Sequence, residues 1–150
     1  MAPKRILLID DDGDDRELFC EALKAVAPDF TCYTAVNGRI ALSAMETGEF
    51  EIPDLIFLDI NMPVMNGWQV LSDLRKQERY KNIPVIIYST STYREDIEMA
   101  LKYGALCFFT KPYGLTELTK SLGWVAAYLV NDLPASSLKT ASLCRCDTIS

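Results

Sequence analysis

We predict a doubly wound α/β fold for this chain, with a five-stranded parallel sheet and five helices packed on both of its faces. Apolar runs of strand length alternate five times with amphipathic stretches of helix length. Four of the five runs are apolar almost throughout, which is typical of strands that helices cover on both sides. Each strand-helix unit is long enough for the right-handed crossover that joins parallel neighbours.

The five predicted strands are short runs rich in β-branched and other apolar residues. RILLID is the first and PVIIYS is the most strongly apolar. FTCYTAV is the one run that is not apolar nearly throughout. The predicted strands cover residues 5–10, 30–36, 54–59, 84–89 and 105–110.

The five predicted helices show apolar residues three and four positions apart. Asp14 or Asp15 is placed to cap the first helix, while Asn37 and Asn66 are placed to cap the second and third. Gly104 stands at the C-cap position of the fourth. The predicted helices cover residues 16–27, 40–48, 67–77, 93–104 and 116–130.

Length and charge narrow the class of protein. A chain of 150 residues, 49% hydrophobic, supports one well-packed domain, which we place at residues 4–130. Residues 131–150 lose periodicity, so we expect a C-terminal tail with no output domain. A net charge of −6 argues against binding nucleic acid. No apolar run reaches the ~20 residues of a membrane span, so we expect no membrane association and a cytoplasmic location.

The chain contains no histidine and five cysteines. The absence of histidine excludes a Ser-His-Asp triad, a Cys-His pair and a phosphohistidine on this chain. It also removes the usual partner of cysteine in zinc sites. We expect reduced structural thiols at all five cysteines, which are Cys20, Cys32, Cys107, Cys144 and Cys146.

Polar residues follow four of the predicted strands at the same relative position. In folds of this class the carboxyl ends of the strands meet at one edge, where ligands bind. These side chains are therefore expected to converge, although they are about a hundred residues apart in sequence. They are Asp10, Asp11 and Asp12, then Asp59, then Ser89 and Thr90, and finally Thr110 and Lys111.

Such a group has the composition of a phosphoryl-transfer site. Clustered carboxylates repel one another unless a cation neutralises them, and oxygen ligands alone favour a hard ion, most plausibly Mg²⁺. A lysine and a hydroxyl opposite the metal would hold phosphoryl oxygens, and an aspartate can itself be the nucleophile. Taken singly, the acidic run is explained by a helix cap, Asp59 and Lys111 by turns, and Ser89 by a cap.

The stretches LLIDDD, DLIFLDINMPVMNGW, PVIIYST and GALCFFTKPY, in this order and spacing, resemble the signatures of response regulator receiver domains of two-component signalling. The resemblance covers about residues 4–130 and implies a flavodoxin-like strand order of 2-1-3-4-5. It implies a CheY-like stand-alone receiver, phosphorylated by a sensor histidine kinase or a histidine phosphotransfer protein, that signals to an unknown protein target.

The resemblance also assigns roles to particular residues. Asp59 is expected to accept the phosphoryl group, Ser89 to be the switch hydroxyl, and Lys111 to pair with the phosphate. Mg²⁺ is expected on Asp10, Asp11, Asp59 and the backbone carbonyl of Asn61. Phe108 falls at the aromatic switch position and is expected to turn inward when Ser89 moves. A cis bond before Pro112 and a homodimer through helix 4, strand 5 and helix 5 are further expectations.

Two other functions fit parts of the sequence. IDDDGD resembles the start of haloacid-dehalogenase-type phosphatases, in which Asp10 would be the nucleophile and Asp12 the general acid. Asp14 stands where that family has threonine, and DINMPVMNG has no place in it. The other reading is an interaction module that uses the receiver fold without phosphorylation, although the complete set of site residues argues against it.

Overall fold

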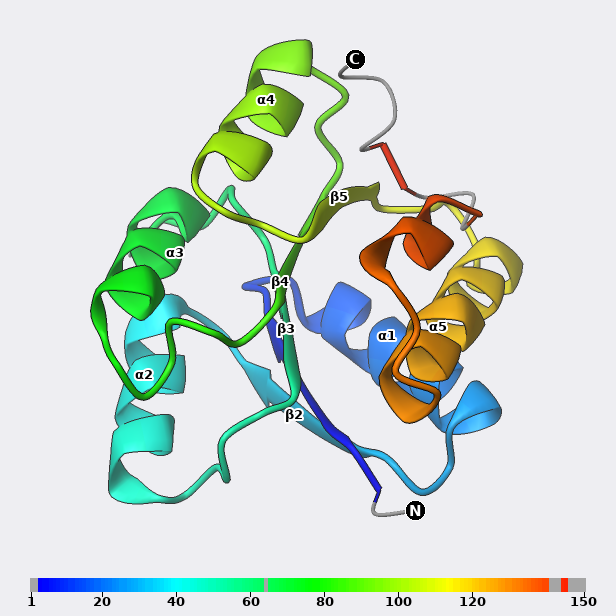
Figure 1. Ribbon diagram of the computed structural model, residues 1–150, viewed down its shortest axis with the longest axis horizontal. Helices are drawn as coiled ribbons and strands as arrows, with labels where there is room; N and C mark the ends of the chain where they lie inside the picture. Colours follow the sequence, from blue (N-terminus) through cyan, green and yellow to red (C-terminus); the bar gives the residue numbers. More distant parts are fainter. Residues whose placement is uncertain (1–2, 64, 141–143, 146–150) are drawn as a thin grey trace.

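The computed structural model describes residues 3–63, 65–140 and 144–145, and it confirms the predicted fold. All five strands pair in parallel in the order β2-β1-β3-β4-β5 (Figure 1). The strands are β1 (Arg5–Ile9), β2 (Thr31–Ala35), β3 (Leu55–Leu58), β4 (Val85–Ser89) and β5 (Cys107–Thr110). The helices are α1 (Gly13–Val26), α2 (Gly38–Thr47), α3 (Gly67–Lys76), α4 (Arg94–Lys102) and α5 (Leu115–Val130).

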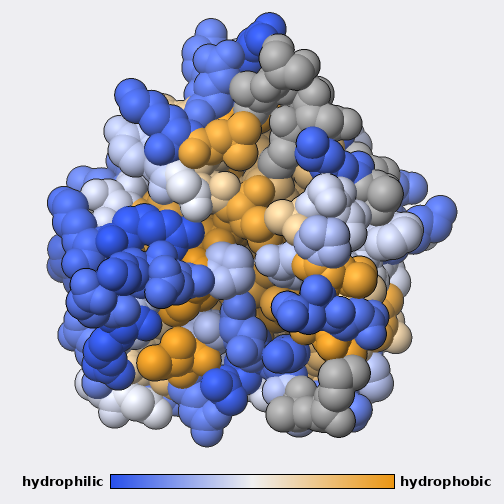
Figure 2. Space-filling model, viewed as in Figure 1, coloured by the Kyte–Doolittle hydropathy of each residue, from blue (hydrophilic) through white to orange (hydrophobic). Residues whose placement is uncertain are grey.

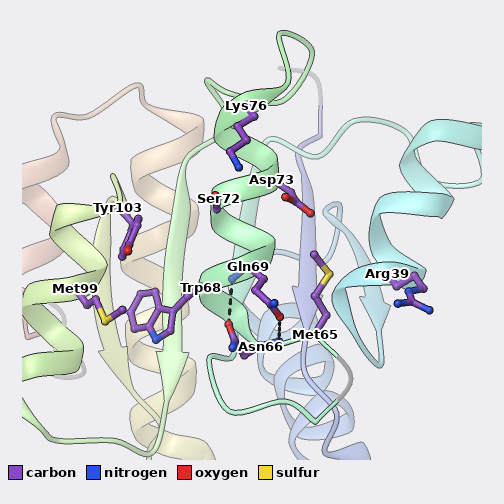
Figure 3. Close-up of a pocket in the computed structure, with 10 residues that line it drawn as sticks. All are labelled: Arg39, Met65, Asn66, Trp68, Gln69, Ser72, Asp73, Lys76, Met99 and Tyr103. Atoms are coloured by element: carbon purple, nitrogen blue, oxygen red, sulfur yellow. Dashed lines mark hydrogen bonds between the residues drawn. The ribbon is translucent and has the colours of Figure 1, made fainter.

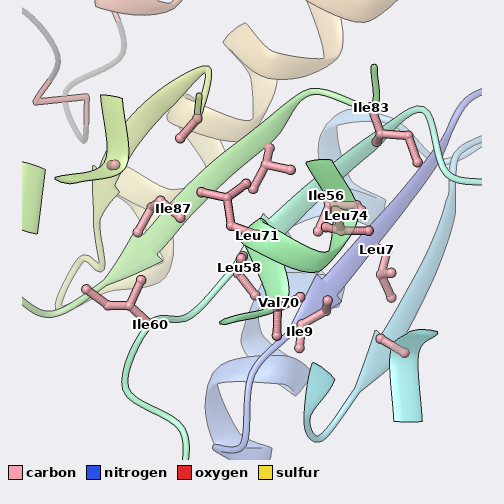
Figure 4. Packing of buried hydrophobic residues seen from close by; sticks show 14 of the residues in the cluster. Leu7, Ile9, Ile56, Leu58, Ile60, Val70, Leu71, Leu74, Ile83 and Ile87 are labelled. Atoms are coloured by element: carbon pink, nitrogen blue, oxygen red, sulfur yellow. The ribbon is translucent and has the colours of Figure 1, made fainter. Parts of the chain in front are cut away.

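The two faces of the sheet have separate hydrophobic cores because side chains alternate along each strand. Ile6 and Leu8 of β1 face the core that α1 and α5 cover. Leu7 and Ile9 face the core that α2, α3 and α4 cover (Figure 4). Burial on both faces explains why β1, β3 and β4 are apolar at nearly every position.

The face of the molecule drawn in Figure 2 carries both polar and apolar side chains. Hydrophilic side chains cover the side on which α2 and α3 lie, and apolar side chains show between the elements near the middle of the view (Figure 2). Within the described residues, no helix is long and apolar enough to cross a membrane.

The helix caps agree with the prediction at α2 and α3 and differ at α1. Asn37 accepts a hydrogen bond from the backbone N–H of Ile40, and Asn66 forms a reciprocal capping box with Gln69. The prediction of Asp14 or Asp15 as the cap of α1 is wrong. The helix begins earlier, at Gly13, and its cap is Asp12.

Asp12 is the cap because its backbone is extended while its carbonyl already accepts the first helical hydrogen bond, from Arg16, at 3.0 Å. Its carboxylate Oδ1 accepts from the N–H groups of Asp14 and Asp15 at 2.9 and 3.2 Å. The side chains of Asp14 and Asp15 are thereby left for other roles in the first turn of the helix.

Part of the predicted C-terminal tail packs onto the domain beside α5 and β5 (Figure 1). Residues Ala135–Thr140 form a 3₁₀ helix, η1, and Leu138 is buried in the same core as α1 and α5. Cys144 is also buried and forms an isolated antiparallel bridge with Phe109. The backbone N–H of Arg145 donates to the carbonyl of Phe108 at 2.8 Å. The outer edge of β5 is thus paired over at least these two residues.

We predict that Asp12→Ala lowers the free energy of unfolding by about 1 kcal/mol, because two backbone N–H groups at the start of α1 lose their acceptor. Asp14→Ala is the matched control. It removes the same charge from the same turn and is expected to cost only a few tenths of a kcal/mol. Urea denaturation of both variants measures the difference, and equal losses would show that Asp12 is not the cap.

We predict that Leu138→Ala destabilises the protein by about 2–4 kcal/mol, because Leu138 is 1% exposed and its removal leaves a cavity beside α5. Leu115→Ala, at a leucine that is 39% exposed, is the control and should change the free energy of unfolding by less than about 1 kcal/mol. A loss at Leu138 no larger than that at Leu115 would mean that η1 is not part of the folded core.

Candidate functional site

Most of the polar residues predicted to converge do meet at the carboxyl ends of the strands, namely Asp10, Asp11, Asp59, Ser89 and Lys111. Asp10 directly follows β1, Asp59 follows β3, Ser89 ends β4 and Lys111 follows β5. The sheet ladder continues into the site, because the N–H of Asp59 donates to the carbonyl of Ile9 at 2.9 Å. The main chain therefore fixes these side chains where the strand order places β1, β3 and β4 side by side.

Asp10, Asp11 and Asp59 form an acidic group. Each has one carboxylate oxygen within 4.8 Å of one such oxygen of the other two. Asp10 and Asp59 are buried and Asp11 is exposed, so the group opens to solvent on one side. Backbone N–H groups hold the two buried carboxylates, with Asp12 donating to Asp10 at 3.0 Å and Asn61 donating to Asp59 at 3.1 Å.

Lys111 is the cation of the group. Its Nζ lies 2.7 Å from Oδ2 of Asp10, 2.8 Å from Oδ2 of Asp15 and 3.5 Å from Oδ2 of Asp59. Burial alone would lower the pKa of Lys111, but these carboxylates outweigh burial and raise the pKa above its ordinary value. The lysine therefore stays charged. Its ammonium also lies 5.5 Å from the centre of the Tyr88 ring.

Asp59 is poorly neutralised by comparison. Burial and, to a lesser degree, nearby Asp10 raise its pKa to about 6, against the opposing effects of Lys111 and of the Asn61 N–H. Lys111 is closer to Asp10 and Asp15 than to Asp59. Asp59 is thus a buried carboxylate whose charged form a further cation would stabilise.

Ser89 lies at the end of β4 and is completely buried. Its Oγ accepts from the N–H of Ser91 at 3.2 Å and lies 3.5 Å from the side-chain nitrogen of Asn61. Its carbonyl accepts from the N–H of Lys111 at 2.8 Å. The Ser89 hydroxyl therefore contacts Asn61, two positions after Asp59. The Ser89 main chain is hydrogen-bonded to that of Lys111.

One expectation around β5 needs correction. The Lys111–Pro112 bond is trans, the isomer that X–Pro bonds favour by about 0.5–1 kcal/mol. Phe108, the expected switch residue, is fully buried in the core covered by α2, α3 and α4. The other strand-5 candidate, Thr110, has a buried hydroxyl that finds no hydrogen-bond partner among the described residues.

The sequence prediction missed two residues of this site. Asp15, assigned only to the start of α1, pairs with Lys111, and Arg16 donates from Nη1 to the Asp10 carbonyl at 2.8 Å. Both lie in the first turn of α1, three and four residues after Asp12. Once Asp12 is known to be the cap, this spacing turns both side chains toward the end of β1.

Gly67 explains part of the DINMPVMNG stretch. A Cβ at this position would lie 2.5 Å from the carbonyl oxygen of Asp59 and 2.6 Å from the Cα of Ile60, both backbone atoms. The N–H of Gly67 donates to the Ile60 carbonyl. The first residue of α3 therefore packs directly on the backbone that follows β3, and only glycine fits there. Val64, within this stretch, lies outside the described residues.

A groove of about 640 Å³ beside α3 is a different feature (Figure 3). Met65, Trp68, Met99 and Tyr103 line it together with charged side chains such as Arg39. It holds a single carboxylate, that of Asp73, and no residue of the acidic group. The groove offers no comparable chemistry, so the strand-end group is the candidate site.

Comparison with known proteins agrees with this geometry. The response regulator receiver domain family matches residues 6–123. Response regulator Rcp1 of Synechocystis sp. is 31% identical over 140 residues, covering 89% of this chain and 95% of Rcp1. Sensor histidine kinase CheAY of Helicobacter pylori is 34% identical over 114 residues, and the match spans 76% of this chain but only 14% of that protein.

Solved structures give the same result. The phosphorylated cyanobacterial phytochrome response regulator RcpA superposes with a TM-score of 0.80 at 28% identity, covering 89% of this chain and 98% of RcpA. The Mn²⁺-bound form of Rcp1 superposes with a TM-score of 0.75 at 29% identity, covering 88% and 98% of the two chains. The fold, the acidic group with its lysine and the match over residues 6–123 lead to one conclusion: this chain belongs to the response regulator receiver domains, which are phosphoacceptor signalling domains of two-component phosphorelays.

Proposed function

We propose that this protein accepts a phosphoryl group on Asp59 from the phosphohistidine of a sensor histidine kinase or a histidine phosphotransfer protein. The observation that carries the proposal is the setting of Asp59, a buried carboxylate at a strand end beside two further carboxylates and a buried lysine. The donor histidine lies outside these 150 residues, because they contain none.

In the proposed reaction an Asp59 carboxylate oxygen attacks the phosphorus atom, and the bond from phosphorus to the imidazole nitrogen breaks with its electron pair going to the imidazole. Lys111, which stays protonated, pairs with a phosphoryl oxygen. The Ser89 hydroxyl donates a hydrogen bond to a second phosphoryl oxygen in the product. For this the serine exchanges its present contacts with Ser91 and Asn61.

We propose Mg²⁺ as the cofactor, held by Asp10, Asp11 and Asp59 with the Asn61 backbone beside them. The donor set fits a hard cation, since it offers only oxygen atoms within 4.8 Å of one another and one open side. A related structure, that of Rcp1, is described as Mn²⁺-bound. When bound, the ion would neutralise charge on the phosphoryl oxygens and on Asp59.

We further propose that the signal leaves through the surface formed by α4, β5 and α5. Residues Cys144 and Arg145 already pair with β5. A protein target, or a second copy in a homodimer, would therefore contact this segment or displace it. Phe108 remains our candidate relay, responding within the core.

The phosphatase alternative fits the structure poorly. Its general acid would be Asp12, but that carboxylate accepts two backbone N–H groups as the cap of α1. Its nucleophile would be Asp10, which is completely buried and paired with Lys111 at 2.7 Å. Asp59 carries neither constraint to the same degree, so it is the better nucleophile.

We predict that the protein takes up one phosphoryl group when incubated with Mg²⁺ and a small acyl phosphate, as measured by intact mass. Asp59→Asn should abolish the uptake because the attacking carboxylate is gone. Asp29→Asn, at an exposed aspartate outside the site, is the matched control and should be phosphorylated like the unchanged protein.

Asp10→Asn and a phosphoryl mimic separate the phosphoacceptor from the phosphatase and from the interaction module. Asp10→Asn should slow the uptake without moving the modified residue away from Asp59, because Asp10 acts through the metal in our proposal. Persistent labelling of Asp59→Asn, or turnover of a phosphate monoester that is lost in Asp10→Asn alone, would contradict the proposal and support the phosphatase. Failure to bind beryllofluoride with Mg²⁺ would support the interaction module.

We also predict that Asp59→Asn stabilises the metal-free protein above pH 6, by up to about 3 kcal/mol. The pKa of Asp59 is about 6 in the folded state against 3.8 as its ordinary value, so folding favours the protonated form. Its contribution to stability is complete below pH 3.8 and is lost as the pH rises through 6. The advantage of the asparagine should therefore shrink between pH 6 and pH 4.

Urea denaturation across this pH range, with a chelator present, measures the effect. Asp29→Asn again serves as the control, and Mg²⁺ should reduce the advantage by stabilising the unchanged protein. An advantage that is constant with pH would mean that the charge of Asp59 costs the fold nothing.

A further inference from the structure

Two cysteines far from the acidic group lie side by side. Cys20 stands in the second half of α1 and Cys32 in the edge strand β2, twelve residues later. Their sulfur atoms are 2.7 Å apart. Both side chains are half-buried, whereas the other described cysteines, Cys107 and Cys144, are buried.

The separation of the sulfurs is close to that of a covalent bond. A disulfide joins its sulfurs at about 2.05 Å, so the two atoms need to approach by only about 0.7 Å. Both thiols are free in the structure, as expected for reduced cysteines. The twelve-residue spacing closes a short loop around the end of α1 and the start of β2.

We propose that Cys20 and Cys32 are a redox modification site that forms an intramolecular disulfide with oxidants of the peroxide class. The Cys20 thiolate attacks one peroxide oxygen, the O–O bond breaks, and the products are a Cys20 sulfenic acid and, after protonation, an alcohol or water. Cys32, losing its proton, then attacks the Cys20 sulfur and expels hydroxide, which leaves as water. Overall, two thiols are oxidised by two electrons and one peroxide is reduced.

The surroundings shift the pKa values of the two thiols in opposite directions. The hydrogen bond from Cys32 lowers the pKa of the Cys20 thiol, against the opposing effect of burial. The same contact and burial raise the pKa of the Cys32 thiol. On this difference we base the proposed order, in which Cys20 reacts with the oxidant and Cys32 resolves the sulfenic acid.

A Cys20–Cys32 disulfide would link α1 covalently to β2 at the edge of the sheet. α1 carries the cap Asp12 and the lysine partner Asp15 at its other end. Cross-linking the helix to β2 restricts the unfolded chain and holds the helix against the sheet. We therefore expect oxidation to raise the melting temperature by several degrees, reversibly with a thiol reductant.

The test is oxidation of the folded full chain by hydrogen peroxide, followed by alkylation of the remaining thiols and tryptic digestion without reduction. Lys24 separates the two cysteines, so Cys20 falls in peptide 17–24 and Cys32 in peptide 25–39. The expected result is a linked pair of these peptides as the main disulfide product, at roughly tenfold the yield of any other pair.

Single-residue variants test the order of the steps and guard against a failure to fold. Cys32→Ser should accumulate a sulfenic acid at Cys20 that a dimedone probe traps, whereas Cys20→Ser should give little trapping at Cys32. Cys107→Ala, at a buried cysteine, is the matched control and should form the linked peptides normally. Circular dichroism of each variant shows whether it is folded.

Three outcomes would overturn the proposal. The first is a different cysteine pair as the main product. The second is irreversible oxidation of both thiols without the linked peptides. The third is formation of the Cys20–Cys32 bond no faster in the folded protein than in concentrated urea, since the folded geometry would then contribute nothing.

Discussion

The site depends on one buried cation, the ammonium of Lys111, which stands between carboxylates from three different parts of the chain. Asp10, Asp15 and Asp59 come from the end of β1, the first turn of α1 and the end of β3. Without the lysine, carboxylates packed this closely in a buried setting would repel one another and favour protonation. With it, Asp10 and Asp15 are neutralised and Asp59 only in part. The partial neutralisation leaves Asp59 as the carboxylate that another cation would stabilise most.

This arrangement follows from the parallel sheet. In a parallel sheet the carboxyl ends of all strands lie at the same edge. Residues 10, 59 and 111, each directly after an apolar strand, therefore meet in space although they are far apart in sequence. Tight backbone packing then fixes their separation, as at Gly67, where α3 approaches the chain after Asp59 so closely that a Cβ has no room. The precision of the site thus comes from the main chain, and the side chains supply the charge.

The sequence alone predicts the fold and most of the site, but not every cap or tertiary contact. The fold and the strand-end residues could be predicted, because both follow from apolar run length and from what comes directly after each run. Asn37 and Asn66 could be predicted as caps because each was the single good candidate. The cap of α1 could not, because five aspartates stand in six positions from 10 to 15 and all of them suit a helix start. The burial of Leu138 and the approach of Cys20 to Cys32 depend on tertiary packing that no local pattern records.

β5 connects the chemistry to the surface through which we propose the protein signals. Lys111 directly follows the strand, Phe108 within it is fully buried, and its outer edge pairs with Cys144 and Arg145. The backbone N–H of Lys111 also donates a hydrogen bond to the carbonyl of Ser89. In our proposal Ser89 is the residue that would turn toward a phosphate. A closely packed core does not deform continuously, so a shift of Lys111 and Ser89 toward a phosphoryl group has to be accommodated along β4 and β5. The backbone contacts of Phe108 and Phe109 with the C-terminal segment lie directly on that strand, and they are the contacts at which such a shift would first reach the surface.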